Sequence, residues 1–132
     1  MDKHLILASS SPRRSSYLRE LGIRFLEIPS GVDERRLREE TPYRYVKRLA
    51  IAKTLAVSKR HPEVPVVGAD TIVVVDGQVL GKPRDPPEAR RMLRTLSGRS
   101  HRVLSGMAMV GEATGFGERV DSGVSSTRVF FR

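Results

Sequence analysis

Short apolar runs alternate along this chain with segments that open on a polar residue followed by proline, and this alternation restricts the possible folds. Ser11-Pro12 and Thr41-Pro42 each combine a helix-capping residue with the proline that suits a first helical turn. The apolar run before the first of them, Leu5 to Ala8, has the length of a buried strand. Strands that alternate with helices are typical of proteins whose helices cover a sheet. The sequence therefore predicts an α/β or α+β fold.

The helix that begins at Pro12 has a clear predicted end. Gly22 follows its last turn and is suited to stop a helix, while Leu18 and Leu21 are expected to form its apolar edge. The next apolar segment, Ile23 to Ile28, is the second predicted strand.

The helix that begins at Pro42 is expected to continue to about Arg60. Its apolar stripe, at the spacing of one helical face, consists of Val46, Leu49, Ala50 and Val57. Lys53 falls on the same stripe. Its ammonium group either reaches back to water along the apolar surface or is aimed into a functional site, and the residues alone leave both possibilities open.

A polar segment separates two further strand candidates. Val64 to Val67 and Ile72 to Val75 are strand-like, and Gly68 to Thr71 lie between them, which places Asp70 at the end of a strand. Ligands of open α/β sheets bind at the carboxyl ends of strands. The polar residues 9–14, which follow the first strand, are expected to lie at the same kind of position.

The second half of the chain predicts a hairpin, a third helix and two long strands. Asp76-Gly77 is a strong turn signal, and Asp85 is the expected cap of the helix. His101 to Val110 and Arg119 to Phe131 are the predicted strands, joined by a loop over residues 111–118. The apolar stripe expected for the third helix consists of Ala89, Met92, Leu93 and Leu96.

The composition removes several classes of function. The chain has no cysteine and only three histidines, which excludes disulfides and thiolate chemistry and argues against a histidine-based metal site. The longest apolar run, Ile72 to Val75, is far shorter than a membrane-spanning helix, and the N-terminal apolar run is too short for a signal peptide. We therefore expect a cytoplasmic protein without a membrane partner.

The charge balance indicates an anionic ligand. There are 24 Lys and Arg residues against 15 Asp and Glu residues, a net charge of +9. This excess suits a nucleic acid, a membrane surface or a polyphosphate. With three tyrosines, four phenylalanines and no tryptophan, the chain lacks the interleaved aromatic and basic residues that bind single strands. The composition therefore argues against a nucleic-acid partner.

Two groups of polar residues suit a phosphate ligand and a metal ion. Residues 9–14 place hydroxyls, helix N-terminal amides and two guanidinium groups around one turn, although a serine cap with two solvated arginines is the common alternative. Asp70 is a candidate general base or metal ligand, although a lone aspartate is more often a turn residue. The carboxylates Glu34 and Asp70 and the cations Arg13, Arg14, Lys53 and Lys82 are together the residue types that cleavage of a nucleoside polyphosphate with a hard divalent cation requires.

Six short motifs follow one another along the chain: LASSSPRR (residues 7–14), VDE (32–34), AK (52–53), GADTIV (68–73), LGKP (80–83) and LSGRSH (96–101). In order and spacing they resemble the Maf family of nucleotide pyrophosphatases. The resemblance implies a mixed twisted sheet flanked by helices, like the fold of the inosine-triphosphate pyrophosphatases. It also implies hydrolysis of a nucleoside triphosphate to its monophosphate and pyrophosphate with a divalent cation, Mg²⁺ or Mn²⁺.

The resemblance also implies roles for single residues. Asp70 matches the proton acceptor that activates water, and together with Glu34 it would hold the metal. Arg13 and Thr71 match positions that select the substrate, and their identity is similar to that of the branch acting on dTTP and UTP. The residues that would surround the phosphates are Ser9, Ser11, Arg14, Lys53 and Lys82.

The chain departs from the family in its length. Maf proteins usually continue for several dozen residues more, through a Lys-Ala-Gly-Ala-Tyr-Gly-Ile-Gln segment that has no counterpart here. We therefore expect one domain over residues 1–132, incomplete at its C-terminus, with an exposed sheet edge or apolar surface that favours self-association or a homodimer. Two other functions remain open: a non-catalytic nucleotide-binding or regulatory module linked to septum formation, and, from the charge alone, a nucleic-acid binder.

Overall fold

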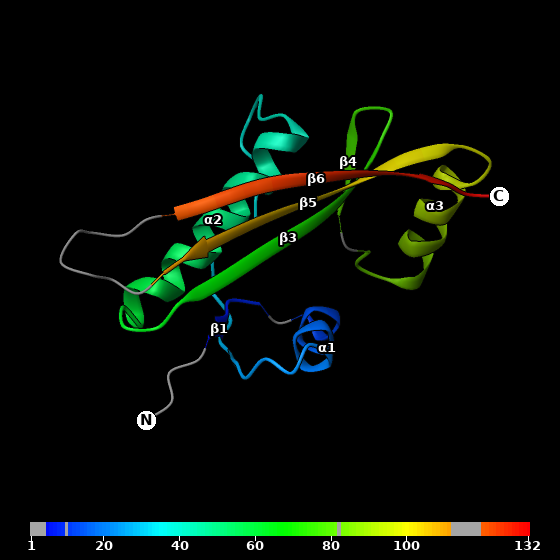
Figure 1. Cartoon of the computed structure of the whole chain (residues 1–132). Helices are drawn as coiled ribbons and strands as arrows, with labels where there is room; N and C mark the ends of the chain where they lie inside the picture. Colours follow the sequence, from blue (N-terminus) through cyan, green and yellow to red (C-terminus); the bar gives the residue numbers. More distant parts are fainter. Residues whose placement is uncertain (1–4, 10, 82, 112–119) are drawn as a thin grey trace.

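The computed structural model describes residues 5–9, 11–81, 83–111 and 120–132 and arranges them as a mixed sheet with helices around it (Figure 1). In chain order the elements are β1 (Ile6–Leu7), α1 (Pro12–Glu20), β2 (Leu26–Glu27), α2 (Pro42–Arg60), β3 (Val66–Val75), β4 (Gln78–Leu80), α3 (Pro86–Leu96), β5 (Ser100–Val110) and β6 (Val120–Phe130).

The sheet has the strand order β2-β1-β3-β5-β6, and β4 also pairs with β3. β1 runs parallel to β2 and β3, whereas the pairs that β3 forms with β4 and β5, and β5 with β6, are antiparallel. The sheet is therefore mixed, as expected. None of the described helices is long and apolar enough to cross a membrane.

One edge of β3 is only partly covered. β5 pairs with residues 66–74 of β3, so β1 and β4 must both lie along the other edge. On that edge β1 pairs with Val66 and Val67, and β4 pairs with residues 73–75. Among the described strands none pairs with residues 68–72 from this side. The GADTI segment therefore lies at a gap in the sheet.

The helix α2 packs closely on β3 and β5, because two glycines leave room for it. A Cβ atom on Gly68 would collide with the Thr54 hydroxyl, and one on Gly106 would lie 2.5 Å from the backbone oxygen of Val46. The predicted apolar stripe of α2 is fully confirmed: Val46, Leu49, Ala50 and Val57 are all buried. This close packing determines which side chains of β3 reach α2.

Several local predictions are confirmed. Asp76 and Gly77 both have positive φ, 49° and 75°, as the hairpin turn requires. Thr41 accepts a hydrogen bond from the backbone amide of Arg44, and Asp85 accepts one from that of Glu88, so both caps form. The predicted starts of α2 and α3 depended on these two caps.

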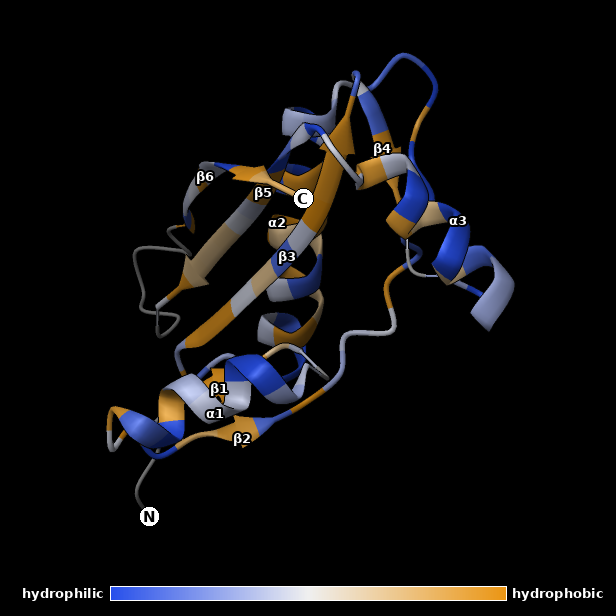
Figure 2. Ribbon diagram, turned by 90° about the vertical axis from the view of Figure 1, so that its right-hand side faces the viewer, coloured by the Kyte–Doolittle hydropathy of each residue, from blue (hydrophilic) through white to orange (hydrophobic). Residues whose placement is uncertain are grey.

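The predicted break in the middle of β3 is wrong. The sequence separates Val64 to Val67 from Ile72 to Val75, but residues 66–75 form one continuous strand. Figure 2 shows that the apolar ends of β3 flank a more polar middle, which nevertheless belongs to the strand. β5 pairs with this middle section residue by residue, Gly68 opposite Ala108 and Asp70 opposite Gly106. Long-range pairing therefore outweighs the local turn signal.

Three other predictions need correction. The strand expected over residues 23–28 is reduced to Leu26–Glu27. Leu21 is 72% exposed and Leu93 is 55% exposed, so α1 and α3 bury less of their apolar edges than expected. In Figure 1 no described element covers the outer side of either helix. Of the predicted loop before β6, residues 112–118 lie outside the described part of the chain.

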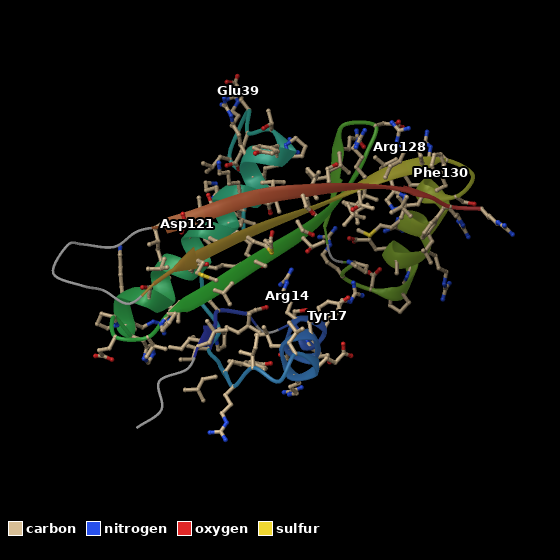
Figure 3. All side chains as sticks on the ribbon, viewed as in Figure 1. Arg14, Tyr17, Glu39, Asp121, Arg128 and Phe130 are labelled. Atoms are coloured by element: carbon tan, nitrogen blue, oxygen red, sulfur yellow. The ribbon has the colours of Figure 1, made fainter. Side chains whose placement is uncertain are left out.

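The strand β6 forms one end of the sheet. Nearly all of its side chains are exposed, and Phe130 is 73% exposed. Figure 3 shows Asp121, Arg128 and Phe130 projecting from this strand. An edge strand is therefore exposed among the described residues, as the sequence led us to expect.

Candidate active site

Lys53 lies between two carboxylates. Its Nζ atom is 2.9 Å from Asp70 Oδ1 and 2.5 Å from Glu34 Oε1. The side chains of Lys53 and Asp70 are only 13% and 14% exposed. The ammonium group therefore does not reach back to water from the apolar stripe. It is bound at the junction of α2, β3 and the loop that carries Glu34.

The environment of Lys53 favours its charged form. Burial alone would lower the pKa of Lys53, but the hydrogen bonds with Glu34 and Asp70 outweigh burial and raise the pKa above its usual value. The two acidic groups thus hold an ammonium cation between them.

Asp70 occupies the middle of β3, not the strand end predicted from sequence. Its partner across the ladder is Gly106, whose Cα faces the α2 backbone at Val46. Asp70 therefore points to the same face as α2, where it meets Lys53. The β3 edge at this position, between β1 and β4, is unpaired among the described strands.

The loop before α2 is attached to that helix by side chains that the sequence analysis did not single out. Tyr45 donates a 2.5 Å hydrogen bond from its hydroxyl to the backbone oxygen of Glu34. Arg48 donates to both carboxylate oxygens of Glu40, at 2.6 and 3.0 Å, and to the backbone oxygen of Arg35. These contacts hold Glu34 beside Lys53. Burial, followed by the charges of Asp70 and Glu34, raises the pKa of Tyr45.

A second cluster forms where β1 leads into α1. Ser9 Oγ accepts hydrogen bonds from the backbone amide of Ser11, at 3.1 Å, and from Arg14 Nη1, at 3.2 Å. The other terminal nitrogen of Arg14 donates to Thr71 Oγ1 at 3.0 Å. Figure 3 shows Arg14 extending from α1 toward β3. Ser11 occupies the expected N-cap position but makes no side-chain cap bond.

The two clusters lie on opposite faces of one strand. Successive side chains of a strand alternate between faces, so Asp70 turns to α2 while Thr71 turns to Arg14. They still interact electrostatically: burial lowers the pKa of Arg14, the charge of Asp70 opposes this effect, and the charge of Arg13 adds to it. Both clusters include a residue of the β3 segment 68–72, whose edge between β1 and β4 is unpaired among the described strands.

Comparison with known proteins identifies the family. A family profile described as Maf-like protein matches residues 4–132. The chain belongs to the Maf family. This confirms the assignment suggested by the six sequence motifs.

Curated relatives of this Maf-family chain share a name. The dTTP/UTP pyrophosphatase of Symbiobacterium thermophilum is 56% identical over 108 residues, covering 82% of this chain and 56% of that protein. The dTTP/UTP pyrophosphatase of Shewanella denitrificans is 45% identical over 134 residues, covering 96% of this chain and 65% of that protein. The Maf chain thus spans less than two thirds of the length of either relative.

Solved structures confirm the expected fold. A nucleoside-triphosphatase, or dITP/XTP pyrophosphatase, from Mycobacterium abscessus aligns with a TM-score of 0.54 at 20% identity, covering 92% of this chain and 72% of that one. The Staphylococcus aureus Ham1 protein aligns with a TM-score of 0.56 at 15% identity, covering 95% and 71%. At these identities the likeness concerns the fold alone.

The Maf motifs are only partly joined by direct contacts. Lys53, Asp70 and Glu34 form one bonded cluster, and Ser9, Ser11, Arg14 and Thr71 form the other. Arg13 is exposed and acts on the second cluster through its charge on Arg14. Lys82 lies outside the described residues.

The Maf site offers suitable atoms to a hard cation, but few of them. Among the described residues no group of three or more acidic or histidine side chains is arranged to hold a metal. Asp70 and Glu34 nevertheless converge on one positive group, the ammonium of Lys53. Carboxylate oxygens suit Mg²⁺ or Mn²⁺, which usually take further ligands from water and phosphate. Both carboxylates already pair with Lys53, so a divalent ion would have to compete with its ammonium group for them.

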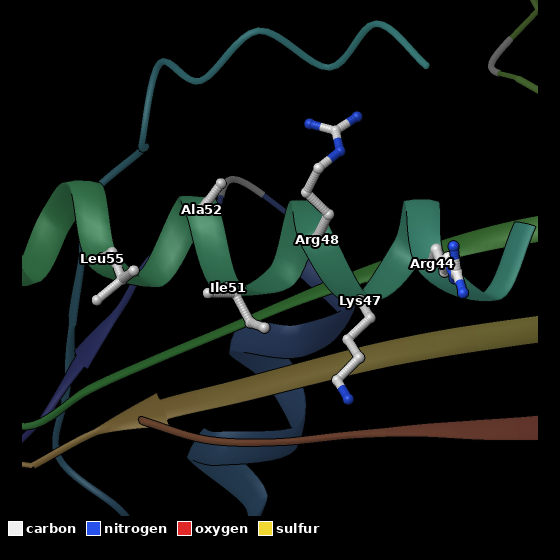
Figure 4. A pocket seen from close by; sticks show the side chains of 6 residues that line it. All are labelled: Arg44, Lys47, Arg48, Ile51, Ala52 and Leu55. Carbon is white, nitrogen blue, oxygen red and sulfur yellow. The ribbon is translucent and has the colours of Figure 1, made fainter. Parts of the chain in front are cut away.

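The outer face of α2 carries a separate pocket. It lies on the side of the helix away from the sheet-facing stripe, and it contains none of the residues expected in the Maf site (Figure 4). Its lining consists of Arg44, Lys47, Arg48, Ile51, Ala52 and Leu55. We therefore assign the candidate site to the β3 gap and not to this pocket.

One member of the second cluster was missed by the sequence analysis. Ser105 of β5 lies directly opposite Thr71, and the two hydroxyl oxygens are 3.2 Å apart. No local sequence signal marks Ser105, because only the β3–β5 register brings it to the site.

Proposed function

We propose that this chain contains the catalytic centre of a nucleoside triphosphate pyrophosphatase that converts dTTP and UTP to the monophosphate and pyrophosphate. The observation that carries the proposal is the largely buried contact of Asp70 with Lys53, with Glu34 on one side and the charge of Arg14 nearby. An acid and several cations around one gap suit a triphosphate better than a neutral ligand. The names of the curated relatives support the same substrate class.

In the proposed reaction Asp70 acts as the general base. Its carboxylate accepts a proton from water while the water oxygen forms a bond to the α-phosphorus. The bond between the α-phosphorus and the bridging oxygen to the β-phosphate breaks, and pyrophosphate leaves. Lys53 is bound to Asp70 before substrate arrives. A triphosphate competes for its ammonium group, which releases Asp70 to accept the proton and neutralises the leaving group.

The second cluster provides the binding surface for the phosphates and the base. Ser9, Ser11 and Arg14 lie at or just before the start of α1, and the N-terminal amides of a helix suit an anion. Arg13 and Thr71 are proposed to select the base, and Lys82 to join the phosphate-binding cations. A divalent cation, Mg²⁺ or Mn²⁺, held by Asp70 and Glu34 would offset the charge of the phosphate oxygens.

The test is product analysis with a matched pair of variants. The chain is incubated with dTTP or UTP and Mg²⁺ or Mn²⁺, and pyrophosphate and inorganic phosphate are measured separately. We expect pyrophosphate with little free phosphate. Asp70→Asn should reduce turnover by a factor of at least about 100, the usual scale for removing a general base. Asp76→Asn, in the exposed hairpin turn, is the control and should leave turnover unchanged.

Other outcomes would change the assignment. Release of inorganic phosphate in place of pyrophosphate would contradict attack at the α-phosphorus. Equal activity of Asp70→Asn and Asp76→Asn would remove Asp70 from the mechanism. Binding of dTTP without any hydrolysis would contradict the proposed enzymatic function and would favour a non-catalytic nucleotide-binding module.

A further inference from the structure

Thr71 is held from two sides by residues of different elements. Arg14, on α1, donates to Thr71 Oγ1 at 3.0 Å. Ser105 Oγ, on β5, lies 3.2 Å from the same Thr71 oxygen. Ser105 stands directly opposite Thr71 in the antiparallel ladder, so the backbone register keeps the two hydroxyls together. The position of the Thr71 hydroxyl is therefore set by the fold and not by Thr71 alone.

The number of bonds that a hydroxyl can make limits what Thr71 can offer to a ligand. A threonine hydroxyl has one proton and can accept two hydrogen bonds. Arg14 can only donate, so it occupies one of the two accepting positions. If Ser105 donates to the second, Thr71 must direct its own proton elsewhere. If Thr71 donates to Ser105, Thr71 can only accept a bond from a ligand.

These two arrangements select different bases. Uracil and thymine present a carbonyl oxygen at C4, which accepts a hydrogen bond, whereas cytosine presents an amino group there, which donates one. A Thr71 hydroxyl that donates suits the carbonyl and opposes the amino group. A hydroxyl that accepts would suit cytosine. The direction of the bond between Ser105 and Thr71 thus decides which pyrimidine fits.

We propose that Ser105 is a positioning residue for nucleotide selection, which donates to Thr71 and so leaves the Thr71 proton to bind the C4 carbonyl of uracil or thymine. The inference rests on the proposed function, because it assumes that a nucleotide occupies the β3 gap beside Thr71. It adds a residue of β5 to a site whose other described members come from the loop after β1, from α1, α2 and β3, and from the loop before α2.

The experiment compares UTP with CTP in three variants. Ser105→Ala removes the donor, so the Thr71 hydroxyl can turn either way. Ser105→Thr keeps a hydroxyl on the same strand position and is the rescue. Ser125→Ala is the matched control, because Ser125 pairs with Ser105 from the other side, on the edge strand β6, and is exposed. Circular dichroism and thermal unfolding establish that each variant is folded.

The expected result concerns the ratio of kcat/KM for UTP to that for CTP. Ser105→Ala should lower this ratio about three- to tenfold, the effect of one hydrogen bond, mainly through a higher KM for UTP and a lower KM for CTP. Ser105→Thr and Ser125→Ala should keep the wild-type ratio. An equal loss for both nucleotides in Ser105→Ala would show a merely structural role and overturn the proposal.

Binding measurements separate this proposal from the proposed reaction. Calorimetry with the non-hydrolysable α,β-imido analogues of UTP and CTP gives the same ratio without turnover. If the wild-type chain prefers the UTP analogue and Ser105→Ala loses that preference, Ser105 has its proposed role even when no pyrophosphate is released. If the chain binds both analogues equally, or neither, the role of Ser105 is refuted.

Discussion

Lys53 of α2 donates a 2.9 Å hydrogen bond to Asp70 of β3, 17 positions later in the chain. The contact depends on the close approach of helix and strand that Gly68 permits. A charged pair in this place links the packing of α2 to the chemistry of the site. Because both side chains are largely buried, changes at either one should be measurable in stability as well as in activity.

Replacing Lys53 with methionine should destabilise the fold, because Asp70 and Glu34 lose the positive charge between them. Asp70 and Glu34 would face each other without a cation, which we expect to lower the free energy of unfolding by about 1–3 kcal/mol. Mg²⁺ should then restore stability more strongly in Lys53→Met than in the wild type. Urea denaturation with and without Mg²⁺ measures both effects. Lys47→Met, on the outer face of α2, is the control and should show neither.

The pH dependence of stability should reflect the raised pKa of Lys53. When the pKa of a group is higher in the folded state than in the unfolded state, its whole contribution to stability is present at pH values below the pKa of the unfolded state. The usual lysine value is 10.5. The stabilisation should therefore disappear as the pH rises through the higher folded-state pKa. The difference in unfolding free energy between wild type and Lys53→Met should be constant near neutral pH and shrink above about pH 10. A constant difference up to the most alkaline pH measured would contradict this origin.

Tyr45 should stabilise the loop that carries Glu34. Tyr45→Phe removes the hydrogen bond to the backbone of Glu34, and we expect a loss of about 1 kcal/mol together with faster amide hydrogen exchange in residues 33–40. Tyr43→Phe is a suitable comparison, because Tyr43 lies on the same helix and is 51% exposed. Exchange rates in the loop that are the same in both variants would show that Tyr45 does not hold it.

The contact of β5 with α2 should tolerate no side chain at Gly106. Gly106→Ala places a Cβ 2.5 Å from the backbone oxygen of Val46, which neither partner can relieve without moving the helix. Overpacking of this kind costs about 1–3 kcal/mol. Gly123→Ala is the matched control, since a Cβ there has no neighbour within 4 Å. Equal melting temperatures of the two variants would refute the tight helix–sheet contact.

Much of the local structure follows from residues that act on their immediate neighbours. Thr41 and Asp85 accept hydrogen bonds from amides three residues later, and proline suits the position after each of them. Gly98 takes a positive φ of 71°, which ends α3 where the sequence predicts. Such signals need no information about the rest of the chain, because both partners lie within one turn.

The composition of the site could be predicted in part. The motifs single out Lys53, Asp70 and Glu34, and the structure brings these three side chains into contact. They also include Ser9, Arg14 and Thr71, which form a second group. The motif pattern could not tell that the two groups lie on different faces of β3, because that depends on Asp70 and Thr71 being consecutive residues of one unbroken strand.

The sequence by itself determined the family, the helix boundaries and the residue types of the turn before α1. The tertiary structure alone decided that Asp70 lies inside β3, that Tyr45 and Arg48 hold Glu34 in place, and that Ser105 reaches Thr71. The physical reason is the range of the interactions. A cap or turn is stabilised by atoms a few residues apart. The ladder between β3 and β5 instead pairs Gly68 with Ala108 and Thr71 with Ser105, 40 and 34 positions apart, and overrides the local turn preference of Gly68 to Thr71.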